Sequence, residues 1–252
     1  MKQSVFTLER TRRLAGDVWE LVLSGDTSAV TAPGQFVNIA LPGKFLRRPI
    51  SVCDWAEERL TLLVKEAGEG TKELVRLPAG TRLDALSGLG NGFDPAAAPE
   101  GAVLVGGGIG VAPLFGLAMR MREAGRAVTA VLGYRSSWDA FYQEMFAAIG
   151  ADLRLVTEDG SLGTGTKGFV TDALREELPD CRYVMACGPT PMLRAVCALP
   201  QIAGGQFSFE ARMACGFGAC VGCSIEKKNG LRRVCKDGPV FRKEDIVWLI
   251  CL

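Results

Sequence analysis

The sequence predicts a multi-domain α+β protein with an N-terminal antiparallel β-barrel, a central α/β domain built on a parallel sheet, and a small C-terminal segment. Short β-type runs separated by turn residues extend from residue 4 to about residue 82, which is typical of an antiparallel barrel or sandwich. Apolar β runs then alternate with helix-like stretches, and beyond residue 207 the chain becomes rich in Cys and Gly. The predicted domains span residues 1–97, 98–206 and 207–252.

Each element follows from its local pattern. The barrel strands are expected at residues 18–23, 35–40, 50–53 and 59–64, and the Pro/Ala run at 95–99 reads as a linker. Parallel strands are expected at 103–105, 128–132, 153–156 and 183–186, with helices ending near Arg122 and covering 140–149 and 191–199. The C-terminal segment is too small for a core of its own, so metal is expected to hold it together.

Composition excludes several classes of function. Twenty-nine Lys and Arg balance 28 Asp and Glu, so no net field would attract nucleic acid or an anionic membrane. The chain has no His, which removes the commonest general base and metal ligand. Residues 101–119 carry no charge, but Gly106–Gly108 and Pro113 interrupt them, so a strand, turn and helix are expected instead of a membrane span. An N-terminus without an apolar signal favours the reducing cytoplasm.

The most specific motif is a cysteine cluster. Cys215, Cys220, Cys223 and Cys235 are spaced C-x4-C-x2-C-x11-C, the plant-type [2Fe–2S] pattern. The alternative is a structural zinc site, although zinc ligands usually come as two C-x2-C hairpins. The remaining cysteines, Cys53, Cys181, Cys187, Cys197 and Cys251, lack such spacing, and all but Cys187 are expected to be small apolar residues.

Two motifs in the first domain have phosphate-binding chemistry. Arg48-Pro49-Ile50-Ser51 begins a strand, where the arginine could form paired hydrogen bonds with a pyrophosphate and the serine could reach a ring nitrogen. The GEGT motif ending in Gly70 and Thr71 opens a short helix, whose free N–H groups could bind phosphate. An ordinary helix-capping threonine is an equal alternative for this motif.

Three further motifs come at the ends of predicted parallel strands. The glycine-rich stretch at 106–113, with Gly107, Gly108 and Gly110, lies between a strand and a helix, although it lacks the G-x-G-x-x-G form. Glu158 and Asp159 follow the third strand, where a carboxylate could bind a ribose 2′-OH and repel a 2′-phosphate; a plain surface turn is the alternative. Cys187 opens a Cys-Gly-Pro motif after the fourth.

In combination these motifs resemble those of the ferredoxin–NADP reductase superfamily, in the same order. With the cysteine cluster added, the chain resembles the electron-transfer subunits of bacterial dihydroorotate dehydrogenase B over essentially its whole length. The resemblance implies that FAD is bound by the N-terminal barrel and that the central domain binds NAD. It further implies a separate FMN-containing catalytic subunit that oxidises dihydroorotate in pyrimidine (UMP) biosynthesis, in a heterotetramer with two copies of each subunit.

Residue by residue, the resemblance assigns FAD to three groups on the barrel: Arg48, Pro49, Ile50 and Ser51; Leu63, Val64 and Lys65; and Gly70 and Thr71. Ile50 stands where the superfamily often has a tyrosine near the flavin, so backbone contacts should carry more of the binding here. The four clustered cysteines become the cluster ligands. Cys187 is placed near the nicotinamide, with a packing role as the alternative.

The cofactors also imply an order of electron transfer. Hydride carries two electrons whereas a [2Fe–2S] cluster passes one at a time, so a flavin must lie between the cluster and NAD. The expected path runs from FMN in the partner through the cluster and FAD to NAD+, with the cluster segment, including Arg232 and Arg233, facing the partner. The alternatives are the small subunit of a bifurcating ferredoxin–NADP oxidoreductase or of a sulfhydrogenase, and a non-catalytic redox sensor.

Overall fold

The computed structural model describes residues 1–248, so Cys251 lies outside the described residues. The strands are Lys2–Ala15 (β1), Val18–Ser24 (β2), Phe36–Ile39 (β3), Arg48–Ala56 (β4), Arg59–Lys65 (β5), Arg82–Leu89 (β6), Val103–Gly107 (β7), Thr129–Tyr134 (β8), Asp152–Thr157 (β9), Thr166–Lys167 (β10), Tyr183–Cys187 (β11), Gly204–Ser208 (β12), Ser224–Lys227 (β13), Gly230–Arg233 (β14) and Val240–Arg242 (β15). The helices are Glu69–Leu74 (α1), Val111–Glu123 (α2), Gln143–Ala148 (α3), Val170–Glu176 (α4), Thr190–Cys197 (α5) and Val234–Asp237 (α6).

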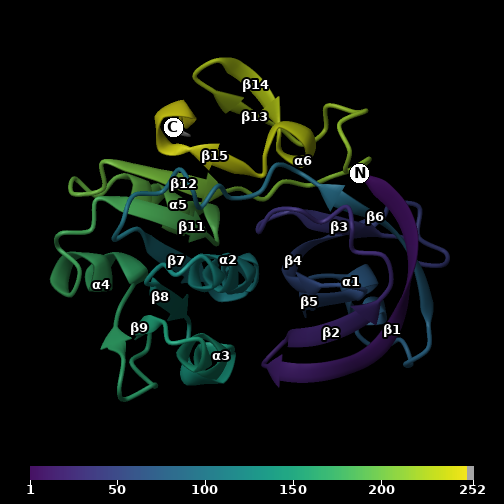
Figure 1. The fold of residues 1–252 in the computed structure, drawn as a ribbon, viewed down its shortest axis with the longest axis horizontal. Coiled ribbons are helices and arrows are strands. Elements are labelled where there is room, and N and C mark those ends of the chain that lie inside the picture. The colour runs from purple at the N-terminus through teal and green to yellow at the C-terminus, as the bar shows by residue number, and fades with distance from the viewer. Residues whose placement is uncertain (249–252) are drawn as a thin grey trace.

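The N-terminal strands close into an antiparallel barrel in the order β1-β2-β5-β4-β3-β6 (Figure 1). Alternate side chains fill its interior, among them Phe6, Leu21, Leu62 and Val64, because successive residues of a strand point to opposite faces. Closure pairs β1 with β6 and leaves no open sheet edge. The predicted antiparallel barrel is therefore confirmed.

The central domain is a seven-stranded sheet in the order β10-β9-β8-β7-β11-β12-β15. Neighbouring strands are parallel except β15, which comes from the C-terminal segment and pairs antiparallel with β12. Helices α2 and α3 pack in one core and α4 and α5 in another, so both faces of the sheet are covered. The expected helix at 140–149 is shorter than predicted, because Tyr142 takes a left-handed conformation with φ 66° and α3 begins after it.

Helix α2 joins the barrel to the sheet. Residues 111–118 are all buried, as expected of a helix that is apolar on every side and packed between two layers. Gly116 permits the close approach, since a Cβ there would lie 2.5 Å from the carbonyl oxygen of Cys53 in β4. Within residues 1–248 no helix is both long and apolar enough to cross a membrane.

Beyond the sheet, the C-terminal segment carries the β13–β14 hairpin and helix α6, which lie above the barrel and the sheet in Figure 1. Asn38 of β3 donates a hydrogen bond to the Cys215 carbonyl oxygen at 3.1 Å. Asn91, just after β6, donates one to the Val240 carbonyl oxygen at 2.7 Å. The segment is therefore bonded directly to the barrel as well as to the sheet.

Candidate functional site

Two adjoining cavities lie between the domains. The barrel pocket, of about 260 Å³, is lined from the barrel side by Pro49, Ile50 and Ser51 of β4, Leu63 and Lys65 of β5, and Thr71 of α1. The edge pocket, of about 610 Å³, lies at the carboxyl ends of β7, β8, β9 and β11, where open α/β sheets bind their ligands. Its volume is in the range of small-molecule sites.

The barrel pocket brings together most of the residues that the sequence assigns to FAD. Strand alternation separates the β5 residues, because Leu63 and Lys65 face the pocket whereas the Val64 side chain is buried in the barrel core. Arg48 lies outside the pocket lining, with its guanidinium beside Gly70. A Cβ on Gly70 would lie 2.0 Å from the Arg48 Nε, so only glycine leaves room for this cation.

The Arg48 guanidinium is free to bind an anion. It donates one hydrogen bond, to the Leu46 carbonyl oxygen, and makes no ion pair among the residues that the structure describes. Thr71 stabilises the start of α1: its hydroxyl accepts hydrogen bonds from the N–H groups of Ala67 and Gly68 at 3.0 and 3.1 Å. A cation, a hydroxyl and an apolar wall fit a flavin dinucleotide. Thr71 lines the pocket and also caps α1, so the two interpretations of this residue are compatible.

The predicted glycines serve close packing at the edge pocket. Gly107 and Gly108 line it, whereas Gly110 lines the barrel pocket. A Cβ on Gly107 would lie 2.4 Å from the Met192 Sδ, and one on Gly110 would lie 2.3 Å from the Cys187 carbonyl oxygen. The glycine loop therefore packs against the turn between β11 and α5, and the two pockets meet there.

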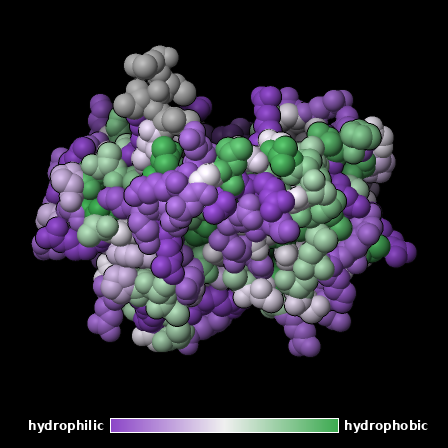
Figure 2. Space-filling model, turned by 90° about the horizontal axis from the view of Figure 1, so that it is seen from above, coloured by the Kyte–Doolittle hydropathy of each residue, from purple (hydrophilic) through white to green (hydrophobic). Residues whose placement is uncertain are grey.

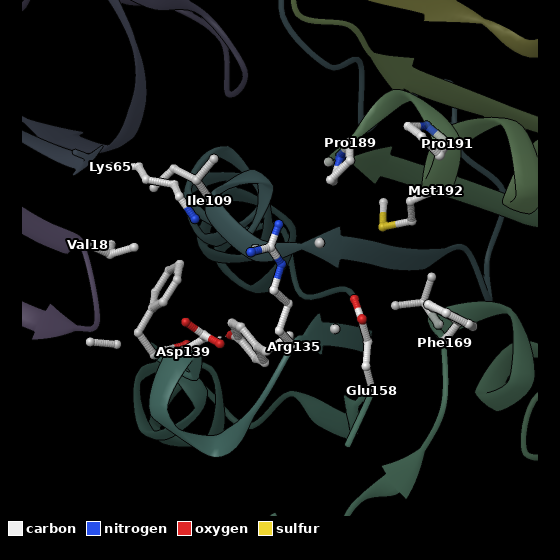
Figure 3. Close-up of a pocket in the computed structure, with 18 of the residues that line it drawn as sticks. Val18, Lys65, Ile109, Arg135, Asp139, Glu158, Phe169, Pro189, Pro191 and Met192 are labelled. Atoms are coloured by element: carbon white, nitrogen blue, oxygen red, sulfur yellow. Dashed lines mark hydrogen bonds between the residues drawn. The ribbon is translucent and has the colours of Figure 1, made fainter. Parts of the chain in front are cut away.

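The two carboxylates predicted to bind the nucleotide, Glu158 and Asp159, have different surroundings in the structure. Glu158 lines the edge pocket and points into it (Figure 3), whereas Asp159 does not line it. The Asp159 carboxylate accepts a hydrogen bond from the Ser161 N–H at 2.9 Å, and this contact lowers its pKa. Glu158 therefore lies where the sequence predicted a nucleotide-binding carboxylate, whereas Asp159 is engaged within its own turn.

Three residues of the edge pocket were missed in the sequence. Arg135, just after β8, extends into the pocket in Figure 3 and makes no ion pair within residues 1–248. Phe169 and Met192 add apolar surface, and the Phe169 side chain stays 61% exposed. The end of β8 was the available signal for Arg135, since every parallel strand of such a sheet ends at the ligand edge.

Where the pockets adjoin, Cys187 lines the barrel pocket and Glu210 lines both. Burial, reinforced by the nearby Glu210 carboxylate, raises the pKa of the Cys187 thiol to about 12. Cys187 is therefore a neutral thiol at physiological pH. Partial removal of water raises the pKa of Glu210. Glu210 lies outside the recognised motifs, so its sequence context gives no signal of a site.

The four predicted ligand cysteines form two pairs of thiols. The Sγ atoms of Cys215 and Cys220 are 3.4 Å apart, and those of Cys223 and Cys235 are 3.3 Å apart. Two sulfurs on one tetrahedral metal with bonds of about 2.3 Å lie roughly 3.8 Å apart, so each pair matches one metal ion. Among residues 1–248, no group of three or more Cys, Asp, Glu or His side chains is arranged to hold a single metal ion. Two pairs fit the two irons of a [2Fe–2S] cluster better than one zinc ion.

Residues 215–223 form the cluster loop. Backbone N–H groups of this loop stabilise the thiolate form of its first cysteine. Burial disfavours the Cys215 thiolate, but N–H groups of Cys220, Phe217 and Gly218 outweigh it and lower the pKa to about 6. Cys215 is then largely ionised at neutral pH, the form that binds metal. Outside this loop, Cys53, Cys181 and Cys197 are buried, as expected of small apolar residues.

The cluster loop lies directly beside the barrel pocket. Ala211 and Met213, just before Cys215, line that pocket. The Asn38 that bonds the Cys215 carbonyl pairs across the strands with Pro49, which lines the pocket from β4. The cluster ligands and the expected flavin site are therefore joined by one strand pair and one hydrogen bond.

Comparison with known proteins agrees with this geometry. Residues 210–247 match the iron-sulfur cluster binding domain of dihydroorotate dehydrogenase B, and residues 104–198 match the oxidoreductase NAD-binding domain. The chain is 40% identical to the dihydroorotate dehydrogenase B (NAD(+)) electron transfer subunit of Shouchella clausii, with 98% of each chain covered. It is 41% identical to the subunit of the same name from a Geobacillus species, over 98% of this chain and 99% of the relative.

Among solved structures, the NADH-dependent reduced ferredoxin–NADP oxidoreductase has a similar chain, with a TM-score of 0.85 and 30% identity over 96% of this chain and 90% of that one. Its identity is lower than that of the two relatives above. The matched domains and the fold establish an oxidoreductase with FAD and a [2Fe–2S] cluster as cofactors and NAD as substrate. The chain belongs to the family of dihydroorotate dehydrogenase B (NAD(+)) electron transfer subunits.

Proposed function

We propose that this subunit receives electrons from an FMN-containing catalytic subunit, which itself carries the dihydroorotate chemistry, and delivers them to NAD+. The complex is a cytoplasmic heterotetramer of two catalytic and two electron-transfer subunits that serves pyrimidine biosynthesis. The observation that carries the proposal is that the segment leading into the cluster loop, at Ala211 and Met213, lines the barrel pocket, since electron transfer needs neighbouring cofactors. When bound, the cluster and the flavin supply the redox chemistry.

The protein's own residues bind and orient these groups. Cys215, Cys220, Cys223 and Cys235 hold the cluster, and the barrel residues that line their pocket, with Arg48 and Gly70, hold FAD. Arg48 supplies a cation for the pyrophosphate, and Ser51 and Lys65 supply polar contacts beside the ring. Leu63 and Ile50 exclude water from its apolar face, and Val64 supports the strand from within the barrel.

The edge pocket holds the NAD. Arg135 is the cation for its phosphates, Gly107 and Gly108 allow close approach, and Glu158 accepts a hydrogen bond from a ribose hydroxyl. Gly110 and Cys187 lie where the pockets meet, so these residues would hold the nicotinamide end of NAD beside the flavin site. The neutral Cys187 thiol can pack against the nicotinamide without placing a charge beside it.

The cluster end of the molecule is the surface that meets the partner. Figure 2 views the molecule from this side and shows apolar groups set among hydrophilic ones. Phe217 and Val221 of the cluster loop are 42% and 75% exposed, and Leu231 of the neighbouring hairpin is 69% exposed. Exposed apolar residues beside a redox centre suit a docking surface. We expect Arg232→Glu to weaken complex formation.

The proposal is tested on the anaerobically purified chain. Its visible spectrum before and after NADH is combined with analysis of iron, sulfide, zinc and flavin. We expect flavin and [2Fe–2S] absorption that NADH bleaches, and co-purification with a subunit that oxidises dihydroorotate. A colourless, zinc-containing protein that does not react with NADH after reconstitution would contradict it and favour the sensor alternative.

A further inference from the structure

Arg233, the last residue of β14, is held in a fixed position beside the cluster ligands. Its Nε donates to the Asp237 Oδ2 at 3.2 Å, and its backbone N–H donates to the same oxygen at 2.8 Å. Its Nη1 donates to the Gly218 carbonyl oxygen at 2.8 Å. The side chain is about one-third exposed, so solvent screens this cation only in part.

Gly218 lies in the middle of the cluster loop, between Cys215 and Cys220. Its φ of +91° suits glycine, and a Cβ there would lie 2.5 Å from the Lys236 Cδ. The turn formed by Arg233 and helix α6, residues 233–237, therefore contacts the cluster loop twice, through the Arg233 hydrogen bond and through the Lys236 side chain. Cys235, the fourth predicted ligand, lies within the same turn, so the turn joins both thiol pairs.

We propose that Arg233 is a positioning residue that raises the reduction potential of the cluster, and that Asp237 moderates this effect. The inference rests on the proposed cluster site. A [2Fe–2S] cluster with four thiolates is an anion that becomes more negative on reduction. A fixed cation favours the reduced form, and charge and hydrogen bonding near the sulfurs are known determinants of cluster potential.

A purely structural role for this ion pair makes a different prediction. If Arg233 and Asp237 only fastened the loop, removal of either side chain would loosen the same contact and change the cluster in the same direction. The electrostatic role predicts opposite directions. Arg233→Gln removes a cation and leaves the Asp237 carboxylate unpaired, whereas Asp237→Asn leaves the cation unpaired with its hydrogen bond to Gly218 intact.

The experiment is a redox titration of the full chain, followed by electron paramagnetic resonance of the reduced cluster, with iron content measured for each variant. We expect a lower potential for Arg233→Gln and a higher one for Asp237→Asn. Arg232→Gln is the matched control, because it removes the same charge from an exposed neighbour whose side chain, within residues 1–248, makes no hydrogen bond or ion pair with the cluster loop, and its shift should be smaller.

Shifts of the same sign in the two variants, or no shift in either, would overturn the inference. An equal shift from Arg232→Gln would also overturn it, because the fixed contact would then be irrelevant. If Arg233→Gln lost its iron, Asp237→Asn would decide: a raised potential supports the inference, and an unchanged or lowered one refutes it. Zinc in place of iron in the unaltered chain would overturn the cluster site itself, whereas iron with unshifted variants would overturn the inference alone.

Discussion

At the scale of single residues, neighbouring side chains of like chemistry have different roles. Glu158 and Asp159 are consecutive carboxylates at the end of β9, yet only Glu158 lines the edge pocket. Asp159 instead accepts a hydrogen bond from Ser161 within its own turn. Sequence shows that a carboxylate stands at the ligand edge, but the direction of each side chain depends on the local backbone.

This pair provides a test of nucleotide preference. Glu158→Gln should raise kcat/KM for NADPH roughly fivefold, because the variant lacks a repulsion of about 1 kcal/mol toward a 2′-phosphate. NADH activity should fall modestly as one ribose hydrogen bond weakens. Steady-state kinetics with both nucleotides and an artificial acceptor measure the ratio. Asp159→Asn is the control and should leave the ratio unchanged; an equal change in both variants would remove Glu158 from its proposed role.

At the scale of elements, the turn from β5 into α1 positions a cation of β4. Arg48 lies against Gly70, and the first turn of α1 has no side chain at that point. Two residues earlier, a Cβ added to Gly68 would have no neighbouring atom within 4 Å. Of the two glycines in the GEGT motif, only Gly70 is needed to leave room for a neighbouring side chain.

We predict that Gly70→Ala weakens FAD binding roughly ten- to a hundredfold. The added methyl group displaces the Arg48 guanidinium, and hydrogen bonds to charged groups contribute about 1.5–3 kcal/mol. The fold should tolerate the change, since Arg48 is a flexible side chain. Gly68→Ala is the matched control and should retain FAD. Flavin fluorescence during dilution measures the dissociation constants, and equal retention by both variants would contradict the placement of Arg48.

At the scale of the whole molecule, polar contacts fix the nucleotide domain against the barrel. The Tyr142 hydroxyl donates to the buried Glu20 carboxylate of β2 at 2.9 Å, and Arg10 and Arg12 pair with the same carboxylate. The Arg120 guanidinium of α2 donates to the Trp55 carbonyl oxygen of β4 at 2.7 Å and lies over the Trp55 ring. These contacts fix the position of the edge pocket relative to the barrel pocket.

Tyr142→Phe should therefore slow reduction of the flavin by NADH several-fold and lower the free energy of unfolding by about 1–2 kcal/mol. Tyr134→Phe is the control: the Tyr134 hydroxyl donates to the Phe141 carbonyl oxygen at 2.6 Å within one domain, and the substitution keeps the ring that lines the edge pocket. It should destabilise the protein similarly without slowing the reaction. Stopped-flow absorbance and urea denaturation measure the two quantities. Equal slowing in both variants would show that domain orientation is not the cause.

Much of the fold was predictable because periodicity and turn residues are local. The strands at 18–23 and 59–64, the alternation of strands with helices, and the cysteine-rich end are all confirmed. Strand β1 was harder to detect, since its sequence mixes charged and apolar residues and its barrel partners are distant. Helix α4 also escaped notice, because only seven residues form it and Phe169 precedes it without a capping side chain.

The sequence by itself determined the fold class, the family and the chemistry of the cluster site, because thiolate spacing and strand-to-helix patterns are properties of short segments. Tertiary structure alone decided which side chains share a pocket. Arg135, Glu210 and Asn38 owe their positions to packing between segments far apart in the chain. Local sequence cannot encode such contacts, since they depend on how α2 joins the barrel to the sheet and on how the C-terminal segment lies across both.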